Sequence, residues 1–200
     1  MSATRIDYYL APISPWAYLG HARFVRIAQA AGACVQVKPM DLGAIFPISG
    51  GLPLPKRAPQ RQAYRLVELK RTSDWLGLPM NLQPTYFPAA GDDAARLIIA
   101  ADLALGSTAA LDIAGRIGAA TWAQQRNIAD PAVLTELLAE AGLPLKLLAD
   151  ASGPEVLQRY AAYTQQAVDA GVFGAPSYVI AGEIFWGQDR LDFVERRLAS

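Results

Sequence analysis

A serine stands where a helix is predicted to begin near the N-terminus. Residues 14–17 read Ser-Pro-Trp-Ala, follow the strand-like run Arg5–Leu10 and open a segment with the apolar spacing of a helix. The hydroxyl of Ser14 and the free backbone N–H groups of a first helical turn are donors that can hold a thiolate. The alternative is purely structural, because serine followed by proline is a common N-cap and first-turn pair. Serine cannot exchange disulfides, so the sequence predicts a site that handles the thiol of another molecule.

A second motif lies near the C-terminus. Residues 174–176 read Gly-Ala-Pro and precede a β-branched and aromatic run over 177–180. Proline lacks an N–H and is tolerated where a strand begins, so Pro176 is interpreted as a strand-entry proline, with a cis bond as an open alternative. A further strand is predicted over 184–186 and an amphipathic helix over 191–198. The chain thus has a strand, a helix and a strand near its start, and two strands and a helix near its end. This is the order of a thioredoxin fold with an insertion.

The middle of the chain supports this insertion. A loop rich in Gly and Pro is expected over Phe46–Pro59, and no convincing strand follows until residue 170. Proline and glycine separate the helices predicted there, which cover 60–76, 92–105, 109–125, 131–141, 144–150 and 154–170.

The predicted fold class is therefore α/β, a thioredoxin-like fold with a large inserted all-helical domain. The predicted domains are 1–45 with 171–200, which are thioredoxin-like, and 46–170, which is helical. The cleft between them is the expected site.

Two motifs carry a resemblance to a known family. They are Ser-Pro-Trp-Ala-Tyr-Leu near the start, and Gly-Val-Phe-Gly-Ala-Pro-Ser with Phe-Trp-Gly-Gln-Asp-Arg-Leu near the end. Over essentially its whole length the chain resembles the 2-hydroxychromene-2-carboxylate isomerases and their relatives, the kappa-class glutathione transferases, in the disulfide oxidoreductase A-like superfamily. The resemblance implies a glutathione-dependent cis-trans isomerase that acts on 2-hydroxychromene-2-carboxylate, or a similar aromatic-degradation intermediate, through reversible thiolate addition. A kappa-type glutathione transferase and a catalytically inactive thioredoxin-like binding protein are the alternatives.

The resemblance implies glutathione as cofactor and roles for five residues. Ser14 would donate to the sulfur, and the backbone of Ala175 would pair with the cysteinyl unit. Gln188 and Asp189 precede the last helix and would hold the γ-glutamyl end, with an N-cap role as the alternative for Asp189. Arg61 matches a basic residue that contacts the glycine carboxylate in the family; Lys56, Arg57 and Arg65 lie nearby, and a solvated charged face is the alternative.

The effect of these donors on the pKa of the bound thiol can be calculated. A charge-assisted hydrogen bond contributes roughly 1.5–3 kcal/mol and a helix end roughly 0.3–1 kcal/mol, against about 1.36 kcal/mol per pKa unit. Together they would lower the pKa of a thiol from about 8.5 to about 6–7, so that thiolate predominates at neutral pH.

Aromatic side chains are expected to form the walls for a small aromatic second substrate. The candidates are Trp16, Tyr18, Tyr86, Phe87 and Trp186, each with a place in the core as the alternative.

The single histidine and the single cysteine are given no catalytic role. His21 lies seven residues along the same helix, about 10 Å from Ser14 by helical rise, and is expected to be packed or solvated. Cys34 lies in a predicted strand and is expected to be a small buried apolar residue. One cysteine cannot form an internal disulfide or a redox pair, which excludes a dithiol oxidoreductase. No metal site is assigned.

Composition excludes further classes of protein. Eighteen basic and eighteen acidic residues cancel, so no nucleic-acid or anionic-membrane partner is expected. No apolar run is long enough to span a membrane, and the first residues lack the apolar core of a signal peptide. We therefore expect a cytoplasmic protein, and the resemblance implies a homodimer.

Overall fold

Four strands form one mixed sheet at the centre of the molecule, in a computed structural model that describes residues 3–199. The strands are β1 (Arg5–Leu10), β2 (Cys34–Pro39), β3 (Ser177–Ile180) and β4 (Glu183–Trp186), in the order β2-β1-β3-β4. The β1 and β2 strands are parallel, whereas β3 is antiparallel to both β1 and β4. A parallel pair needs a crossover, which α1 (Pro15–Ala30) supplies.

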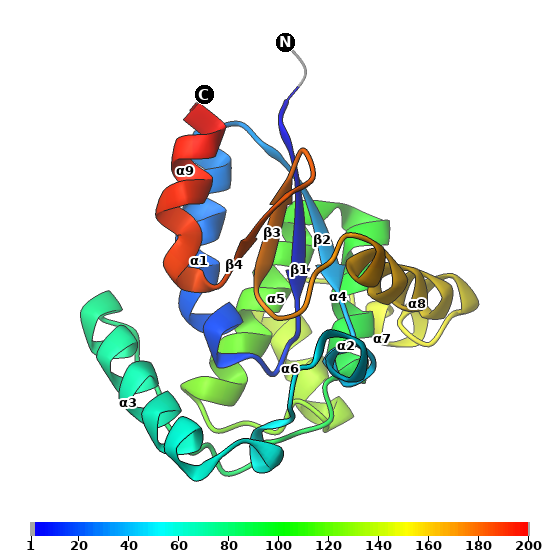
Figure 1. The fold of residues 1–200 in the computed structure, drawn as a ribbon. Helices are drawn as coiled ribbons and strands as arrows, with labels where there is room; N and C mark the ends of the chain where they lie inside the picture. The colour runs from blue at the N-terminus through cyan, green and yellow to red at the C-terminus, as the bar shows by residue number, and fades with distance from the viewer. Residues whose placement is uncertain (1–2, 200) are drawn as a thin grey trace.

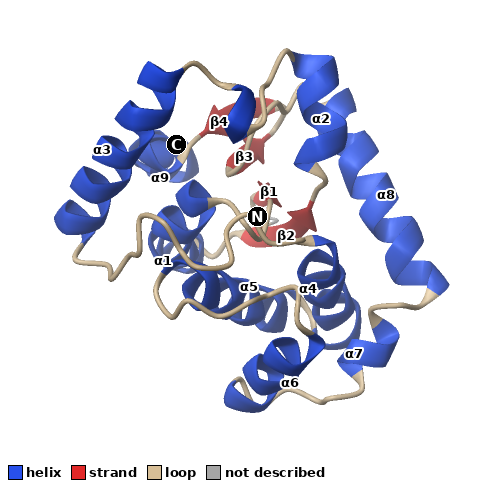
Figure 2. Ribbon diagram, turned by 90° about the horizontal axis from the view of Figure 1, so that it is seen from below, coloured by secondary structure: helices blue, strands red, loops and turns tan. Residues whose placement is uncertain are grey.

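Helices cover both sides of this sheet. In Figures 1 and 2, α1 and α9 (Leu191–Ala199) lie on one side, and α2 (Leu42–Ser49) and α8 (Pro154–Asp169) lie on the other. The remaining elements are α3 (Pro59–Leu76), α4 (Asp92–Leu105), α5 (Ser107–Trp122), α6 (Pro131–Glu140), α7 (Leu147–Asp150) and two short 3₁₀ turns, η1 (Leu54–Lys56) and η2 (Gln188–Arg190). The predicted thioredoxin-like α/β fold with helices inserted between β2 and β3 is confirmed.

The ends of several predicted elements differ from the structure by one to three residues, as three of them illustrate. The α5 helix begins at Ser107, two residues before the predicted start. The helix expected over 144–150 is shorter, because Leu147 and Leu148 make hydrogen bonds to residues only three positions back, as in a tight turn. The β4 strand includes Glu183, which pairs with Ile180 across a turn with positive φ at Ala181 and Gly182.

The expectation of an irregular loop over Phe46–Pro59 is wrong for its first part. The α2 helix continues to Ser49, and η1 forms before α3 begins. The side chain of Asp41 caps α2 by accepting from the N–H of Gly43 at 2.7 Å. This cap starts a helix that continues past Pro47, whereas the glycines and prolines of 46–59 had indicated a loop.

The largest group of buried side chains joins the sheet to the helices. Tyr8 of β1 stacks on Tyr178 of β3, with ring centroids 5.3 Å apart, and Phe24 of α1 packs against Tyr178 at 4.6 Å. The same group includes apolar residues of α4 and α5, such as Ile98 and Ile113. The division of the chain into 1–45 with 171–200 and 46–170 stays a prediction.

Cys34 is exposed, so its predicted burial is wrong. It is the first residue of β2, which lies at the edge of the sheet. Because successive side chains of a strand alternate, Val35 and Val37 face the core while Cys34 does not. Within residues 3–199, no helix is long and apolar enough to cross a membrane.

Candidate active site

Ser14 is the N-cap of α1. Its backbone is extended, with φ −75° and ψ 121°, and its Oγ accepts a hydrogen bond from the N–H of Ala17 at 3.2 Å. Pro15 occupies the first helical position, where a missing N–H costs nothing. The interpretation of Ser14 as the N-cap of a helix is therefore confirmed, and its role as a donor to a thiol stays a prediction.

The hydroxyl of Ser14 also joins the two ends of the chain. It donates to the carbonyl oxygen of Ala175 at 3.1 Å, and the bond is buried. Ala175 precedes Pro176 through a cis peptide bond. Because Tyr9 pairs with Ser177 in antiparallel register, the end of β1 lies beside the start of β3. The sheet thus brings the two sequence motifs together.

Two backbone N–H groups are left over at this junction. The N–H of Ala17 is bound by the Ser14 hydroxyl, and the N–H of Tyr18 donates to the Ser14 carbonyl at 3.1 Å. Among residues 3–199, no group accepts from the N–H of Trp16 or of Ala175. The positive end of α1 therefore presents one free amide, that of Trp16, beside the Ser14 hydroxyl.

The η2 turn lies against α1 near this point. A Cβ added at Gly20 would lie 2.8 Å from the Cβ of Gln188, so glycine is needed for this close approach. Gln188 is buried, and its Oε1 has no hydrogen-bond donor among the described residues. Asp189 is exposed and forms an ion pair with Arg190 at 3.3 Å. The cap interpretation of Asp189 is wrong, because its side chain makes no capping hydrogen bond and Gly187 holds that position in η2.

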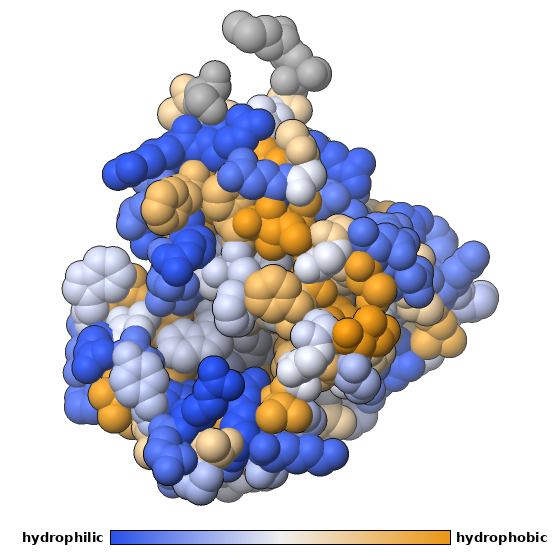
Figure 3. Space-filling view, viewed as in Figure 1, coloured by the Kyte–Doolittle hydropathy of each residue, from blue (hydrophilic) through white to orange (hydrophobic). Residues whose placement is uncertain are grey.

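Arg61 and Arg65 lie one turn apart on α3 in different surroundings. Arg61 is exposed, whereas Arg65 is half-buried and lines a cavity of about 370 Å³ between α3 and the segment 82–87. In Figure 3 the surface is hollowed beside α3. Burial, together with the nearby positive charge of Arg57, lowers the pKa of Arg65 to about 10. Sequence reasoning noted Arg65 only as a neighbour of Arg61; the helical spacing of four residues was the available signal.

The aromatic residues proposed as pocket walls are spread over the surface. Trp16 is half-buried, and Tyr86 and Trp186 are 48% and 51% exposed. None of these three lines the cavity, whereas Phe87 does. Tyr18 donates its hydroxyl hydrogen to the carbonyl of Pro79 at 2.7 Å and so ties α1 to the segment that follows α3.

His21 is packed between α1 and α5. Its Nε2–H donates to the carbonyl of Leu111 at 2.8 Å, so its Nδ1 is left to accept from the Tyr8 hydroxyl at 3.3 Å. Burial lowers the pKa of His21, and the bond to Leu111 opposes this in part. The expectation of a packed helix residue is confirmed. Within residues 3–199, no cluster of His, Cys, Asp or Glu could hold a metal ion.

Comparison with known proteins gives a consistent result. The family described as DSBA-like thioredoxin domain matches residues 5–199. A 2-hydroxychromene-2-carboxylate isomerase of Sphingobium xenophagum is 26% identical over 195 residues, covering 96% of this chain and 97% of that protein. Glutathione S-transferase kappa 1 of Caenorhabditis elegans is 25% identical over 205 residues, covering 95% of this chain and 88% of that protein. The resemblance to both groups is confirmed.

Solved structures show the same fold. A 2-hydroxychromene-2-carboxylate isomerase superposes with a TM-score of 0.79 at 24% identity, covering 98% of this chain and 94% of that chain. The cytosolic disulfide reductase DsbM from Pseudomonas aeruginosa, described with GSH, gives 0.69 at 20% identity, covering 98% and 100%. Together with the sequence relatives, these matches indicate a family of isomerases and thiol-related enzymes.

Proposed function

The chain belongs to the family of DSBA-like thioredoxin domains, and from this premise we propose that it is a glutathione-dependent cis-trans isomerase. Its substrate would be 2-hydroxychromene-2-carboxylate or a similar aromatic-degradation intermediate, as the names of its relatives suggest. The observation that carries the proposal is the hydrogen bond that Ser14, at the start of α1, donates to the carbonyl of Ala175. Ser14 stands where a thioredoxin-type oxidoreductase would carry its redox-active cysteine pair.

The backbone around Ala175 fits an extended thiol peptide. Its carbonyl oxygen and its free N–H are the two groups that an antiparallel peptide needs. When bound, glutathione supplies a thiolate whose addition to the conjugated chain of the substrate would turn a double bond into a single bond that can rotate, and whose elimination would restore the double bond and release glutathione unchanged. The chain itself needs to bind the tripeptide, keep its sulfur ionised and exclude water.

Ser14 has one hydroxyl hydrogen and two prospective acceptors. In the structure this hydrogen is given to the carbonyl of Ala175. A peptide N–H that pairs with Ala175 would replace Ser14 as the donor to that carbonyl, and the hydroxyl would then be free to donate to sulfur. The N–H of Trp16 and the positive end of α1 would add to the stabilisation of a thiolate. Ser14 is thus a donor, because the one imidazole of the chain bonds to Leu111 and Tyr8 and is not available to it as a base.

The two charged ends of glutathione have candidate partners. Asp189 is exposed next to the buried Gln188, so its carboxylate is accessible to the γ-glutamyl ammonium. Gln188 has an unpaired carbonyl oxygen that could accept from the same end. Arg61 is exposed on α3 and is the proposed partner of the glycine carboxylate. Trp16, Tyr86 and Trp186 remain proposed contacts of the aromatic substrate, and they lie outside the lining of the cavity at Arg65.

Disulfide exchange does not fit this site. The one cysteine of the chain, Cys34, pairs with Arg5 at the opposite end of β1 from Ser14. A six-residue strand spans about 20 Å, so Cys34 cannot act at the start of α1.

A kappa-type glutathione transferase is the second candidate. The relative in Caenorhabditis elegans favours it, and it would use the same residues around Ser14. The two activities differ in the fate of glutathione, which an isomerase regenerates and a transferase consumes.

The test follows the isomerisation of 2-hydroxychromene-2-carboxylate by absorbance and counts free thiol during the reaction. The proposal predicts turnover that requires glutathione and leaves its concentration unchanged. S-methylglutathione, which lacks the thiol, is the matched control and should give no turnover. Turnover without glutathione, or none with it, would refute the proposal; loss of thiol in step with product would establish the transferase instead.

We also propose that the protein acts in the cytoplasm as a homodimer. Large apolar side chains on α3 support an interface, since Tyr64, Val67 and Trp75 are 59%, 49% and 71% exposed. Sedimentation equilibrium should give twice the mass of one chain.

A further inference from the structure

Arg65 is a half-buried cation without a counter-charge. Among residues 3–199, no side chain or carbonyl accepts a hydrogen bond from its guanidinium, and no carboxylate pairs with it. Within the described part of the chain, the one charged side chain that affects its pKa is Arg57, which is also positive. The Nε of Arg57 donates to the carbonyl of Leu52 at 2.8 Å. A partly desolvated cation beside a second cation favours the binding of an anion.

Two aromatic rings hold Arg65 in place. Its guanidinium carbon lies 5.4 Å from the centre of the Phe87 ring and 5.6 Å from that of Trp122. Trp122 is fully buried, and its ring packs against Phe87 with centroids 4.8 Å apart. Contact with the aromatic rings orients the guanidinium while its N–H groups remain without acceptors.

The cavity beside Arg65 suits a small, mostly apolar molecule. Its volume of about 370 Å³ lies within the range of small-molecule sites. Apolar side chains form most of its wall, namely those of Leu54, Ala63, Leu66, Leu82, Pro84 and Phe87. Gln62 and Gln83 add neutral amides, and within the described residues no acidic side chain lines it.

We propose that Arg65 anchors the carboxylate of an aromatic or conjugated second substrate, whose apolar part occupies this cavity. A guanidinium offers two parallel N–H donors that match the two oxygens of a carboxylate, which a lysine ammonium does not. The identification of this ligand as the substrate rests on the proposed function, whereas the carboxylate site itself does not.

Glutathione also ends in a carboxylate, so the two sources have to be separated. The apolar walls and the aromatic ring of Phe87 favour an aromatic acid over the polar glycyl end of a tripeptide. The exposed Arg61, one turn earlier on α3, is left for the glycine carboxylate.

The test uses 1-naphthoate as probe and isothermal titration calorimetry without glutathione. Replacing Arg65 by glutamine should weaken binding roughly 10- to 100-fold, as expected for the loss of a charge-assisted bidentate contact. The affinity of Arg65→Lys should lie between those of the wild type and Arg65→Gln, because lysine keeps the positive charge but lacks the two parallel N–H donors of a guanidinium. Arg71→Gln, which removes the same charge from the exposed face of α3, is the matched control and should bind as the wild type does.

Neutral 1-naphthamide and a glutathione arm complete the design. Naphthamide should bind weakly and equally to wild type and Arg65→Gln. Glutathione should bind equally to both. Equal naphthoate binding by wild type and Arg65→Gln would overturn the proposal, and so would an Arg65→Gln effect confined to glutathione. If Arg65→Gln proves unfolded by circular dichroism, the comparison of naphthoate with naphthamide on Arg65→Lys and wild type decides in its place.

Failure of the proposed function would look different. If naphthoate binding depends on Arg65 while no isomerisation occurs, the carboxylate site stands and the isomerase proposal fails. If isomerisation occurs with unchanged KM in Arg65→Gln, the isomerase proposal stands and this assignment is overturned.

Discussion

The hydroxyl of Ser14 donates to the carbonyl of Ala175 across 161 positions of the chain, at 3.1 Å. The bond fastens the start of α1 to the residue before β3, so one side chain stabilises the fold and occupies the proposed sulfur site. A ligand that pairs with Ala175 would break this bond and replace it. Binding and fold stability are therefore linked at Ser14.

Replacing Ser14 by alanine should affect both stability and activity. It removes the N-cap and leaves the buried carbonyl of Ala175 without its donor, so the free energy of unfolding should fall by about 1–3 kcal/mol. Loss of the donor to sulfur should also lower turnover roughly 10- to 100-fold. Urea denaturation and initial rates measure the two effects. The exposed Ser152→Ala should change neither, and wild-type turnover by Ser14→Ala would contradict the role given to the hydroxyl.

Replacing Asp189 by asparagine should weaken glutathione binding. The carboxylate is exposed, so the loss should be modest, at most about fivefold in Kd. An analogue of glutathione without the γ-glutamyl ammonium should bind both proteins equally. The control is Asp192→Asn, the same change three residues later, where the carboxylate pairs with Arg23. Equal affinities of wild type and Asp189→Asn for glutathione would remove Asp189 from the site.

The stability of the protein should fall at mildly acidic pH because of His21. Burial lowers its pKa in the folded state, so the unfolded chain binds the proton more readily. The free energy of unfolding is therefore unaffected above the unfolded pKa of about 6.5 and decreases as the pH falls from there toward the lower folded pKa. Urea midpoints at about pH 7.5 and 5.5 measure the slope. In His21→Gln the slope should be smaller, and an equal slope in both proteins would show that other groups cause it.

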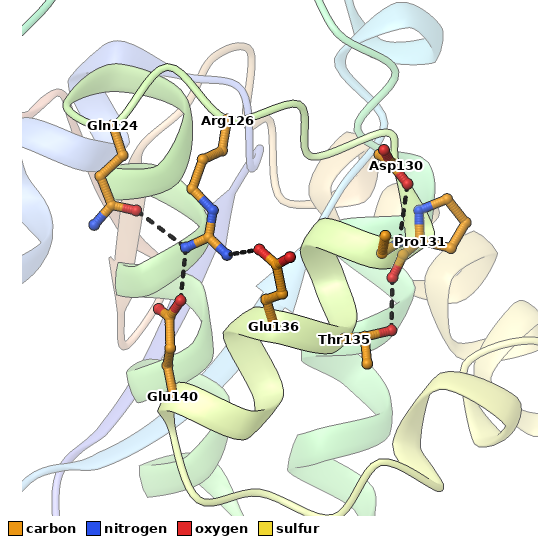
Figure 4. A network of polar contacts seen from close by, with 8 residues as sticks. Gln124, Arg126, Asp130, Pro131, Thr135, Glu136 and Glu140 are labelled. Carbon is orange, nitrogen blue, oxygen red and sulfur yellow. Dashed lines mark hydrogen bonds and ion pairs between the residues drawn. The ribbon is translucent and has the colours of Figure 1, made fainter.

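Arg126 connects the end of α5 to α6. Its guanidinium binds Glu136 at 2.7 Å and Glu140 at 2.9 Å, and it contacts Gln124 at 3.3 Å (Figure 4). Both glutamates are largely exposed, so Arg126→Ala should cost only about 1 kcal/mol of unfolding free energy, less at high salt. Arg116→Ala, which removes one exposed pair within α5, should cost about 0.3 kcal/mol. Equal losses in the two variants would contradict a network effect.

Local sequence signals predicted the fold well where one strong feature marks an element. Ser14 before Pro15 marked the start of α1, and the proline at residue 176 marked the start of β3. A strand was predicted around Cys34, and Val35 and Val37 of that strand do face the core. Whether the side chain of its first residue is covered depends on the helices that pack on the sheet. That information is not local, and so the burial of Cys34 was predicted wrongly.

The site was less predictable than the fold. The meeting of Ser14 with Ala175 follows from the antiparallel register of β1 and β3, which the thioredoxin order implies. The cavity at Arg65 depends on how α3 packs against the segment 82–87 and on the tilted contact between the rings of Phe87 and Trp122. No short-range pattern encodes that packing. Arg61 was proposed because it matches a basic residue of the family, and Arg65 was named only as its neighbour.

The most direct test of the central claim is the pKa of the glutathione thiol when bound, measured from thiolate absorbance as a function of pH. The donors at Ser14 and Trp16 and the end of α1 predict a value of about 6–7, against about 8.5 for a free thiol. In Ser14→Ala the value should move back toward 8.5 by about one to two units. A bound thiol that titrates near 8.5 in the wild type, unchanged in Ser14→Ala, would contradict the account.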